Sequence, residues 1–522
     1  MNIIPKPNGE LKQTEGIWQV RPSMKVDCGG FSFSCITAFS ERTQIHFEAA
    51  SENVDVILAR ESDRKPEEYT LEVTQNGVRI AAAAESGVIL ALTTLYLCMD
   101  SGHVPCFSLN DVPRYTHRGL MLDSVRHFFS ADEVKKIIEQ ISLAKVNKLH
   151  WHLSDDQGFR IEIREYPALY DQIPYYTQDE IREIVRFAKV RNVEVIPEID
   201  MPGHSASAVY VFPWLSCAGK QIKRPTKGGI YKAIMCAGKE STYEFICRVL
   251  DEVADLFESP MIHIGGDEAP KMEWTGCPAC KERLREIGSD NFEDLQGYFT
   301  NRIAEYLKTK GREVICWNEI LRADKLLEGL TIQYWMPGPD DEKTAVFFRD
   351  NGPVIFSDMF KLYLDYPHGV TPLKKVYDYV PAIGNRQCED APNTLGIEVC
   401  LWTERVETNE RLEELLFPRI FALAEAAWTR EKDYDDFERR LSDKVDQLRK
   451  QGICYTLPEN YNPDDAEKMK VLQEIFAGFT GILQEPDDNE VNIAELFGDG
   501  NAGDFLKGFE LDPTILLNGG FK

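Results

Sequence analysis

The chain has 522 residues, which is enough for two or three domains and a full-sized hydrophobic core. Its formal net charge of −27 argues against nucleic acid or anionic lipid as a partner, and a neutral ligand fits better. No apolar run approaches the roughly 20 residues that span a bilayer, so a membrane protein is not expected.

The N-terminus and the cysteines bear on the cellular compartment. Residues 1–6 carry neither a basic nor an apolar leader segment, so a cytoplasmic location is expected, unless a leader was removed from an exported mature form. Thirteen cysteines, scattered through apolar segments, are typical of free thiols in a reducing compartment. Cys277 and Cys280 form the one close pair. A second ligand pair at zinc-site spacing is missing from the sequence, so no metal is expected.

Residues 1–113 are predicted to form a small α/β domain. Segments 54–59, 69–73 and 77–81 have the apolar alternation of strands, and an Asn76-Gly77 turn joins the last two. A helix follows over 86–99, and the segment 109–115 is a plausible domain boundary.

Residues 114–455 show a repeated alternation of strand and helix. Helical stretches are predicted over 131–145, 177–191, 243–257 and 292–310. The predicted strands are 119–123, 148–153, 193–199, 261–265, 313–317, 331–335, 354–357 and 396–402. Eight such strands predict a (β/α)8 TIM barrel. A doubly wound open sheet is the alternative, but no Gly-rich phosphate loop follows the first strand.

The remaining residues, 456–522, are predicted to be a C-terminal extension. A helix over 437–450 precedes it, and the extension itself is irregular and rich in Pro, Asp and Gly. The pattern favours neither a small domain nor a segment wrapped around the barrel.

The most informative segment is His263–Glu268, a short apolar strand that ends in two glycines and two adjacent carboxylates, Asp267 and Glu268. An exposed acidic turn would explain the bare pattern. At the mouth of a buried strand, however, the pKa of one carboxyl can rise while the other group stays ionised. Active sites of barrels lie at the C-terminal ends of strands, so this segment is a candidate catalytic site.

The other predicted strands end in polar and aromatic residues as well. Three tryptophans among carboxylates and an arginine resemble a sugar site, because aromatic faces pack on pyranose C–H groups. The group comprises Arg126, Asp155, Asp200, His204, Trp317, Trp335, Tyr363, Asp365, Trp402 and Glu404. His150 and His152 are explained by strand alternation. A metal-dependent hydrolase is disfavoured because His204 and His263 lack partners at ligand spacing.

Five segments together resemble family 20 glycoside hydrolases, the β-N-acetylhexosaminidases. They are 118–128, 150–156, 200–204, 263–268 and 401–404, in the order of that family, and the resemblance covers roughly residues 1–430. It implies a small α/β domain before a (β/α)8 barrel. It also implies substrate-assisted hydrolysis, in which the 2-acetamido oxygen attacks the anomeric carbon and an oxazolinium intermediate forms with net retention.

The resemblance also implies residue roles. Glu268 would be the general acid and then the base, and Asp267 would orient the acetamido N–H. Asp200 and His204 resemble the pair that supports the acid, and Tyr363 would donate to the acetamido oxygen. Trp317, Trp335 and Trp402 would enclose the acetamido methyl. Arg126, Asp155 and Glu404 would bind the 3- and 4-hydroxyls, and Asp365 the 6-hydroxyl.

Two positions stand apart from this pattern. Arg118 begins a strand and is better read as structural. Many relatives have a tryptophan near the 6-hydroxyl in the segment that corresponds to 376–381. This chain has Tyr379 there, so the sequence does not determine the shape of the pocket around the 6-hydroxyl.

The favoured function is removal of terminal β-linked GlcNAc or GalNAc from oligosaccharides or glycoconjugates, with no cofactor. A disaccharide-releasing enzyme such as a lacto-N-biosidase is a close alternative, and a catalytically silent carbohydrate-binding protein is another. The sequence leaves open the sugar preference, the glycan and the oligomeric state, and an oligomer is compatible with it.

Overall fold

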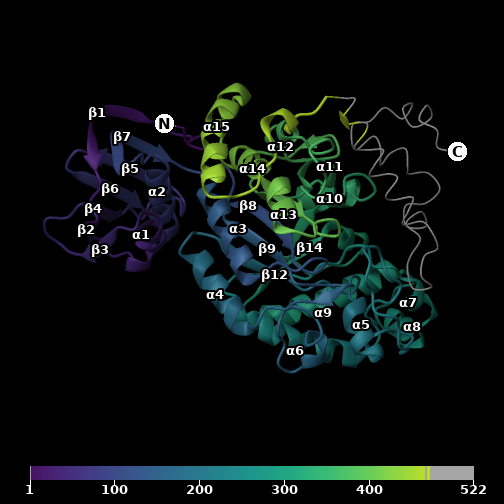
Figure 1. The fold of residues 1–522 in the computed structure, drawn as a ribbon. Helices are drawn as coiled ribbons and strands as arrows, with labels where there is room; N and C mark the ends of the chain where they lie inside the picture. The colour runs from purple at the N-terminus through teal and green to yellow at the C-terminus, as the bar shows by residue number, and fades with distance from the viewer. Residues whose placement is uncertain (1, 465–466, 469, 471–522) are drawn as a thin grey trace.

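The computed structural model describes residues 2–464, 467–468 and 470, so most of the predicted extension at 456–522 lies outside the described residues. An N-terminal α/β domain lies beside a larger barrel domain (Figure 1). The predicted strands and helices are found in both parts, with ends shifted by a few residues.

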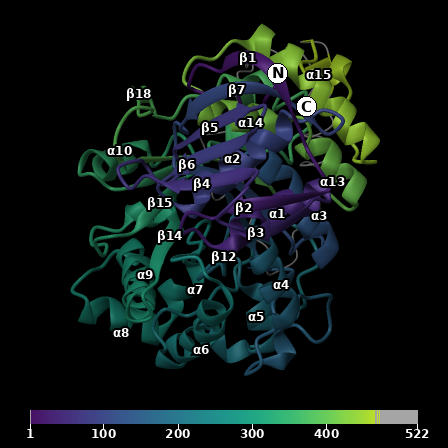
Figure 2. The ribbon, with the colours of Figure 1, turned by 90° about the vertical axis from the view of Figure 1, so that its left-hand side faces the viewer.

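The N-terminal domain is a seven-stranded mixed sheet with strand order β1-β7-β5-β6-β4-β2-β3. The predicted Asn76-Gly77 turn joins β5 and β6 as an antiparallel hairpin. Its strands are β1 (Lys12–Gln19), β2 (Ser23–Asp27), β3 (His46–Ala49), β4 (Val56–Arg60), β5 (Tyr69–Thr74), β6 (Gly77–Ala82) and β7 (His103–Asp111). Helices α1 (Thr37–Thr43) and α2 (Glu85–Leu97) lie on the side of the sheet that faces the barrel (Figures 1 and 2).

Eight parallel strands close the barrel in the order β12-β13-β14-β15-β16-β19-β8-β9, which confirms the predicted (β/α)8 fold. The strands are β8 (His117–Asp123), β9 (Lys148–His152), β12 (Glu194–Glu198), β13 (Met261–His263), β14 (Glu313–Trp317), β15 (Thr331–Tyr334), β16 (Val354–Phe356) and β19 (Thr394–Leu401). Asp123 pairs with His152, His152 with Glu198, and Glu198 with His263. The C-terminal ends of these strands therefore meet at one rim.

The four predicted barrel helices are present as α3 (Ala131–Leu143), α4 (Gln178–Lys189), α6 (Glu240–Leu256) and α9 (Phe292–Thr309). Ser130 and Thr177 each begin a helix with a capping box, in which a glutamate three residues on returns a bond to the cap backbone. The other helices are α5 (Ala206–Val211), α7 (Met272–Gly276), α8 (Pro278–Glu286), α10 (Asp341–Arg349), α11 (Met359–Leu362), α12 (Leu373–Tyr377), α13 (Asn409–Leu416), α14 (Arg419–Trp428) and α15 (Tyr434–Lys450).

Short strands and 3-10 turns lie in the connections between the longer elements. They are the strands β10 (Ser154–Asp155), β11 (Gly158–Phe159), β17 (Ala382–Ile383) and β18 (Arg386–Gln387), and the 3-10 turns at Phe33–Ile36, Pro167–Leu169, Pro213–Leu215, Asn318–Arg322 and Pro458–Asn460.

The inside of the barrel is layered. Ile196, Ile315 and Ile355 form an apolar layer. Glu198, two residues after Ile196 on β12, lies in a second layer with His263 of β13 and Glu398 of β19, and all three are fully buried polar side chains. The rim beyond them carries an aromatic cluster that includes Trp317 on β14 and Trp335 just after β15. The barrel thus changes from apolar to polar to aromatic toward the end where the strands finish.

The N-terminal domain contacts the barrel through buried charges at the opposite end of β8. Arg118 makes two bonds to the carboxylate of Glu67, at 2.7 and 2.9 Å. The Nζ of Lys145 is 2.9 Å from the hydroxyl of Tyr69 and lies over the ring of Trp428. Arg118 is therefore remote from the rim, as its place at the strand start predicts.

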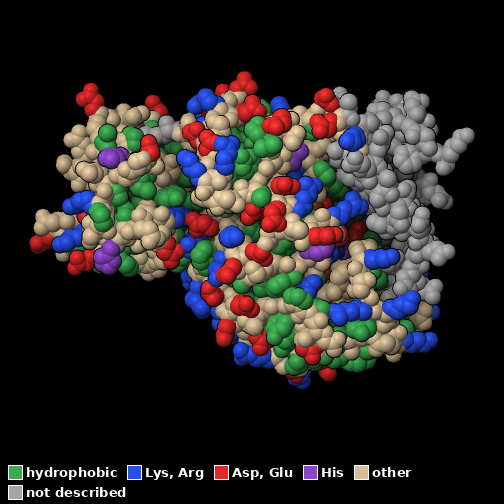
Figure 3. Space-filling view, viewed as in Figure 1, with side chains coloured by type: hydrophobic (Ala, Val, Ile, Leu, Met, Phe, Trp, Pro, Cys, Tyr) green, Lys and Arg blue, Asp and Glu red, His purple; other side chains and the backbone are tan. Residues whose placement is uncertain are grey.

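The surface shown in Figure 3 carries Asp and Glu side chains interspersed with Lys and Arg on both domains, so the acidic excess is not gathered into one patch on this face. Among the described residues, no helix combines the length and the hydropathy needed to cross a bilayer.

Candidate active site

The glycines of the 263–268 segment allow a close approach to the neighbouring strand end. Gly265 and Gly266 both have positive φ, at 68° and 106°. A Cβ on Gly265 would lie 1.7 Å from the Oδ1 of Asp200, so no larger residue fits there. The Gly266 N–H donates to the same oxygen at 3.3 Å. This contact fixes the loop that presents Asp267 and Glu268.

Glu268 and His204 face each other across the rim. The Nε2 of His204 is 3.3 Å from the Oε2 of Glu268 and 3.7 Å from the Oδ2 of Asp267. Both Glu268 and His204 have left-handed backbones, with φ of 43° and 46°, which non-glycine residues rarely adopt. Strain of this kind concentrates at functional sites. The two predicted carboxylates and the predicted supporting histidine are thus brought together.

A chain of polar contacts continues behind His204. Its Nδ1 is 3.2 Å from the Oδ1 of Asp155 and 3.4 Å from the Oδ2 of Asp156. Burial lowers the pKa of His204, but Asp155 and Asp267 outweigh it and raise the pKa well above its ordinary value. A protonated His204 therefore lies between the catalytic pair and two buried aspartates.

The pKa of Asp267 is raised by its surroundings. Burial and the neighbouring Glu268 raise the pKa of Asp267 to about 7, against the opposing charge of His204. Burial and Asp267 likewise raise the pKa of Glu319 to about 8, and the Oε2 of Glu319 accepts the Nε1–H of Trp335 at 2.7 Å. The rim is thus an environment in which carboxyl groups exchange protons near neutrality.

Arg126 lies at the centre of a second group. Its Nη2 is 2.7 Å from Asp155 and 3.6 Å from Glu404, and its guanidinium lies over the ring of Trp402. Asp123 orients the loop, because its Oδ1 accepts the backbone N–H of Arg126 at 3.2 Å. Glu404 is exposed and Asp155 is buried, so Glu404 is the carboxylate of this group that is available to a ligand.

The resemblance implies that Asp155 binds the sugar hydroxyls together with Arg126, but the carboxylate of Asp155 contacts protein side chains instead. Its two oxygens lie against Arg126, His152 and His204, at 2.7, 2.8 and 3.2 Å. The acceptors of Asp155 are therefore occupied within the protein. The geometry makes it the residue that positions both Arg126 and His204, and its hydroxyl contact stays a prediction.

The predicted aromatic residues form one cluster on the other side of the carboxylates. Trp335 and Tyr363 are nearly parallel, with ring centroids 6.2 Å apart. Trp317 lies between Trp335 and Trp402, at 6.5 and 6.1 Å. The Nε1–H of Trp317 donates to Glu198 at 2.9 Å, which fixes its ring. These rings form one apolar cluster, and the charge of Asp267 acts on the hydroxyl of Tyr363 within it.

Asp365 and Tyr379 lie in different surroundings. Asp365 is half-buried, and burial with the nearby Glu404 raises its pKa to about 8. Tyr379 is only 4 % exposed and packs in the main barrel core, outside the aromatic cluster. Tyr379 therefore gives no information on the shape of the 6-hydroxyl pocket, which the sequence left undetermined. Tyr366, whose ring is stacked 6.5 Å from Tyr363, is the aromatic residue beside Asp365.

The sequence reasoning missed a buried network beneath the rim. Glu198 is 3.0 Å from His263 and 3.1 Å from His150, and it also contacts His152. The expectation that His204 and His263 lack partners at ligand spacing was wrong, because each lies within a close group of acidic and histidine side chains. The partners come from other strands, so spacing along the chain could not reveal them. Their position at strand ends was the available signal.

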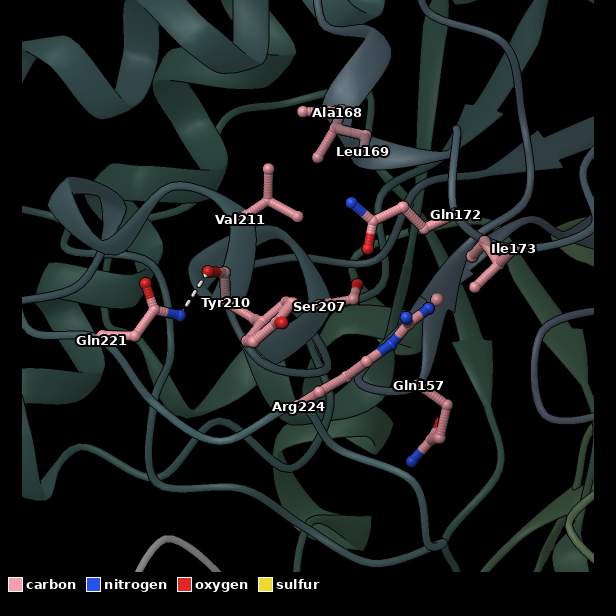
Figure 4. Close-up of a pocket in the computed structure, with 11 residues that line it drawn as sticks. Gln157, Ala168, Leu169, Gln172, Ile173, Ser207, Tyr210, Val211, Gln221 and Arg224 are labelled. Atoms are coloured by element: carbon pink, nitrogen blue, oxygen red, sulfur yellow. Dashed lines mark hydrogen bonds between the residues drawn. The ribbon is translucent and has the colours of Figure 1, made fainter.

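A separate hollow of about 330 Å³ adjoins this site (Figure 4). Ala168 and Leu169 lie on one side of it, and Gln157 and Arg224 on the other. Gln157 links the hollow to the site, because its Oε1 accepts the Nε–H of Arg126 at 3.1 Å. The hollow holds none of the paired carboxylates, so it is a neighbour of the candidate active site.

The arrangement suits acid–base chemistry on a neutral polar ligand with one apolar substituent. A carboxyl pair under the influence of a protonated histidine supplies proton transfer. An arginine with an exposed carboxylate suits neighbouring hydroxyls, and the aromatic cluster suits contact with a methyl group. These are the features expected from the sequence resemblance.

Comparison with known families matches residues 115–431 to the catalytic domain of glycosyl hydrolase family 20. A beta-hexosaminidase of Porphyromonas gingivalis is 34% identical over 430 residues, which are 76% of this chain and 55% of that protein. A beta-hexosaminidase of Akkermansia muciniphila is 33% identical over 72% of this chain and 82% of its own length. The chain thus spans little more than half of the first of these relatives.

Solved structures agree with these matches. A beta-N-acetylhexosaminidase from Bacteroides fragilis superimposes with a TM-score of 0.80 at 32% identity, covering 88% of this chain and 99% of that one. An exo beta-N-acetylglucosaminidase from Vibrio harveyi, solved in complex with N-acetylglucosamine, gives 0.78 at 28% identity, covering 88% and 78%. Both the barrel and the N-terminal sheet therefore have counterparts.

Proposed function

Since the chain belongs to glycosyl hydrolase family 20, we propose that it is a retaining exo-β-N-acetylhexosaminidase, which removes terminal β-linked GlcNAc or GalNAc from oligosaccharides or glycoconjugates. The observation that carries the proposal is the Asp267–Glu268 pair near an aromatic cluster that contains three tryptophans. Such a cluster suits contact with the methyl group of a 2-acetamido substituent.

The proposed reaction uses the substrate's own acetamido oxygen as the nucleophile. Glu268 gives its proton to the glycosidic oxygen as that bond to the anomeric carbon breaks, and the acetamido oxygen closes an oxazolinium ring. Ionised Asp267 accepts the acetamido N–H and stabilises the positive charge that develops on it. Water then attacks the anomeric carbon, gives a proton to Glu268 and reopens the ring with net retention.

His204 and Tyr363 support these steps. His204 is held by Asp155 through its Nδ1, and its Nε2 lies 3.3 Å from the Oε2 of Glu268, so it positions the carboxyl group that transfers the proton. Burial raises the pKa of Tyr363 well above its ordinary value, so its hydroxyl stays protonated and can donate to the acetamido oxygen. His204 and Tyr363 thus support the reaction from positions around Asp267 and Glu268.

The loop that lies against Glu404 favours release of a single sugar over release of a disaccharide. The backbone oxygen of Lys227 accepts the Nε2–H of Gln157 at 2.7 Å, and Gly228 passes so close that a Cβ would lie 2.9 Å from the Cγ of Glu404. This loop borders the Arg126–Glu404 side, where a disaccharide would have to extend beyond the 3- or 4-hydroxyl. A lacto-N-biosidase activity is therefore the second candidate.

The decisive experiment compares hydrolysis of aryl β-GlcNAc and aryl β-GalNAc with hydrolysis of aryl β-glucoside, with and without a thiazoline mimic of the oxazolinium intermediate. Cleavage of the acetamido sugars alone, blocked by the mimic, is the expected result. Cleavage of the glucoside at a comparable rate would contradict the proposal. Activity only on an aryl lacto-N-bioside would establish the disaccharide-releasing alternative, and no cleavage of any substrate would indicate a silent binder.

A further inference from the structure

Four cysteine sulfur atoms from separate parts of the chain meet beside the active-site loops. The Sγ of Cys280 is 3.6 Å from that of Cys217 and 3.5 Å from that of Cys236, and the Sγ of Cys236 is 3.8 Å from that of Cys277. All four Sγ atoms lie within 4.8 Å of one another. Cys217 is half-buried and the other three are buried.

These distances match the geometry of a metal site rather than that of disulfides. Ligands 2.3 Å from a tetrahedral Zn²⁺ are separated by about 3.8 Å along each edge of the tetrahedron. A disulfide would bring two sulfur atoms to about 2.05 Å. Each close pair has the longer spacing, and Cys280 is near two other sulfur atoms at once.

The backbone around the thiols is closely packed. Cys277 is the N-terminal cap of α8 and Cys280 lies in its first turn, which is a geometry that favours thiolates. The Cys236 N–H donates to the Leu215 carbonyl at 2.7 Å, which joins the two ends of the 217–236 loop. A Cβ on Gly238 would lie 2.3 Å from the Ala279 backbone, so the chain passes directly against the start of α8.

We propose that Cys217, Cys236, Cys277 and Cys280 form a tetrahedral Zn²⁺ site with a structural role. All four ligand positions are supplied by protein, which is typical of structural rather than catalytic zinc. The sequence analysis expected no metal, since it found no second close pair of ligands. That expectation missed this group because only the fold brings Cys217 and Cys236 to the Cys277–Cys280 pair.

The position of the four cysteines indicates which parts of the chain the metal would hold together. Cys217 and Cys236 close the loop that contains Gly228, which abuts Glu404, and they belong to the connection after β12 that also carries His204. Cys277 and Cys280 lie in the connection after β13 that also carries Asp267 and Glu268. The Zn²⁺ would thus hold together the two connections that supply the carboxylate pair and its histidine.

The first test measures metal in the whole purified protein by inductively coupled plasma mass spectrometry. About one zinc per chain is expected, released as a mercurial reagent titrates four thiols. Replacement by Co²⁺ should give the charge-transfer and d–d bands of a tetrahedral thiolate site. Protein without stoichiometric metal, protein with iron instead of zinc, or four fewer free thiols by mass spectrometry would overturn the proposal.

A matched pair of variants separates this site from a general effect of losing a cysteine. Cys217→Ser should lose most of its zinc on dialysis against a chelator, and its Tm should no longer respond to chelator. Cys28→Ser, at a half-buried cysteine of the N-terminal domain, should keep both properties of the parent. Equal zinc content in the two variants would contradict the assignment, whatever their activity.

Discussion

Glu268 is placed to transfer a proton, and its substitution should affect substrates according to their leaving groups. Glu268→Gln keeps the size of the side chain but removes the acid, so kcat/KM on a natural glycoside should fall about 10²–10⁴-fold. An aryl glycoside with a very good leaving group needs less protonation and should lose much less. Equal losses on both substrates, measured by steady-state kinetics, would refute the acid assignment.

Asp267 should set the acidic side of the pH profile. Its ionised form is the one that stabilises the acetamido cation, and its pKa is raised to about 7. In the parent enzyme kcat/KM should therefore fall as the pH drops below about 7, where the carboxylate is protonated. Asp267→Asn should lose about 10²–10³-fold in kcat and lose this dependence on pH as well. An unchanged acidic limb in the variant would assign the titration to another group.

At the scale of the strands, a buried polar layer holds β8, β9 and β19 together. The two oxygens of Glu398 are 2.9 Å from His150 and 2.7 Å from His117, and a Cβ on Gly119 would lie 2.1 Å from this carboxylate. Burial lowers the pKa of His150, but Glu198 and Glu398 outweigh it and raise the pKa to about 9. The charged layer thus stabilises the fold while His150 keeps its proton.

Glu398→Gln should destabilise the chain by about 3–5 kcal/mol near neutrality, because one partner of a buried ion pair is removed. The contribution of the raised His150 pKa is complete below its unfolded value and is lost as the pH rises through about 9. Urea unfolding should therefore show a smaller gap from the parent above that pH. Ile397→Val on the same strand should cost about 0.5–1.5 kcal/mol at both pH values. A gap for Glu398→Gln that does not change with pH would contradict this account.

Strand ends could be predicted from the sequence, whereas side-chain partners could not. The predicted strand over 313–317 is β14, and its last residue, Trp317, lies at the rim as expected. The contact of Asp155 with His204, and of Cys217 with Cys280, joins residues from different loops, which no local pattern records. The burial of Tyr379 in the main barrel core could not be predicted either, because the position of a residue in a segment does not fix the direction of its side chain.

At the scale of the whole molecule, the N-terminal domain contacts the barrel far from the catalytic rim. Glu67→Gln should weaken the contact with Arg118 and lower the stability by about 2–4 kcal/mol. The kcat/KM should stay within about twofold, because residues at the N-terminal end of a barrel serve stability. Glu68→Gln, whose partner Arg64 lies within the N-terminal domain, should cost about 0.5 kcal/mol or less. A large loss of activity in folded Glu67→Gln would show that the domain contact influences the site.

The architecture was predictable because the alternation of strand and helix repeats over the whole barrel and the motif residues fall at its strand ends. The division at residues 113 and 455 stays a prediction, although β7 ends at Asp111 and β8 begins at His117. The cytoplasmic location, the oligomeric state and the role of residues 456–522 also stay predictions, because no contact among the described residues bears on them.

The central claim is that the acetamido oxygen of the substrate, and not a carboxylate of the protein, attacks the anomeric carbon. Aryl glycosides whose N-acetyl group carries one, two or three fluorine atoms test this claim most directly, because each fluorine makes that oxygen a weaker nucleophile. We expect log kcat/KM to fall steeply along the series. A flat response, with the same aryl leaving group throughout, would show that the nucleophile belongs to the enzyme and would contradict the account.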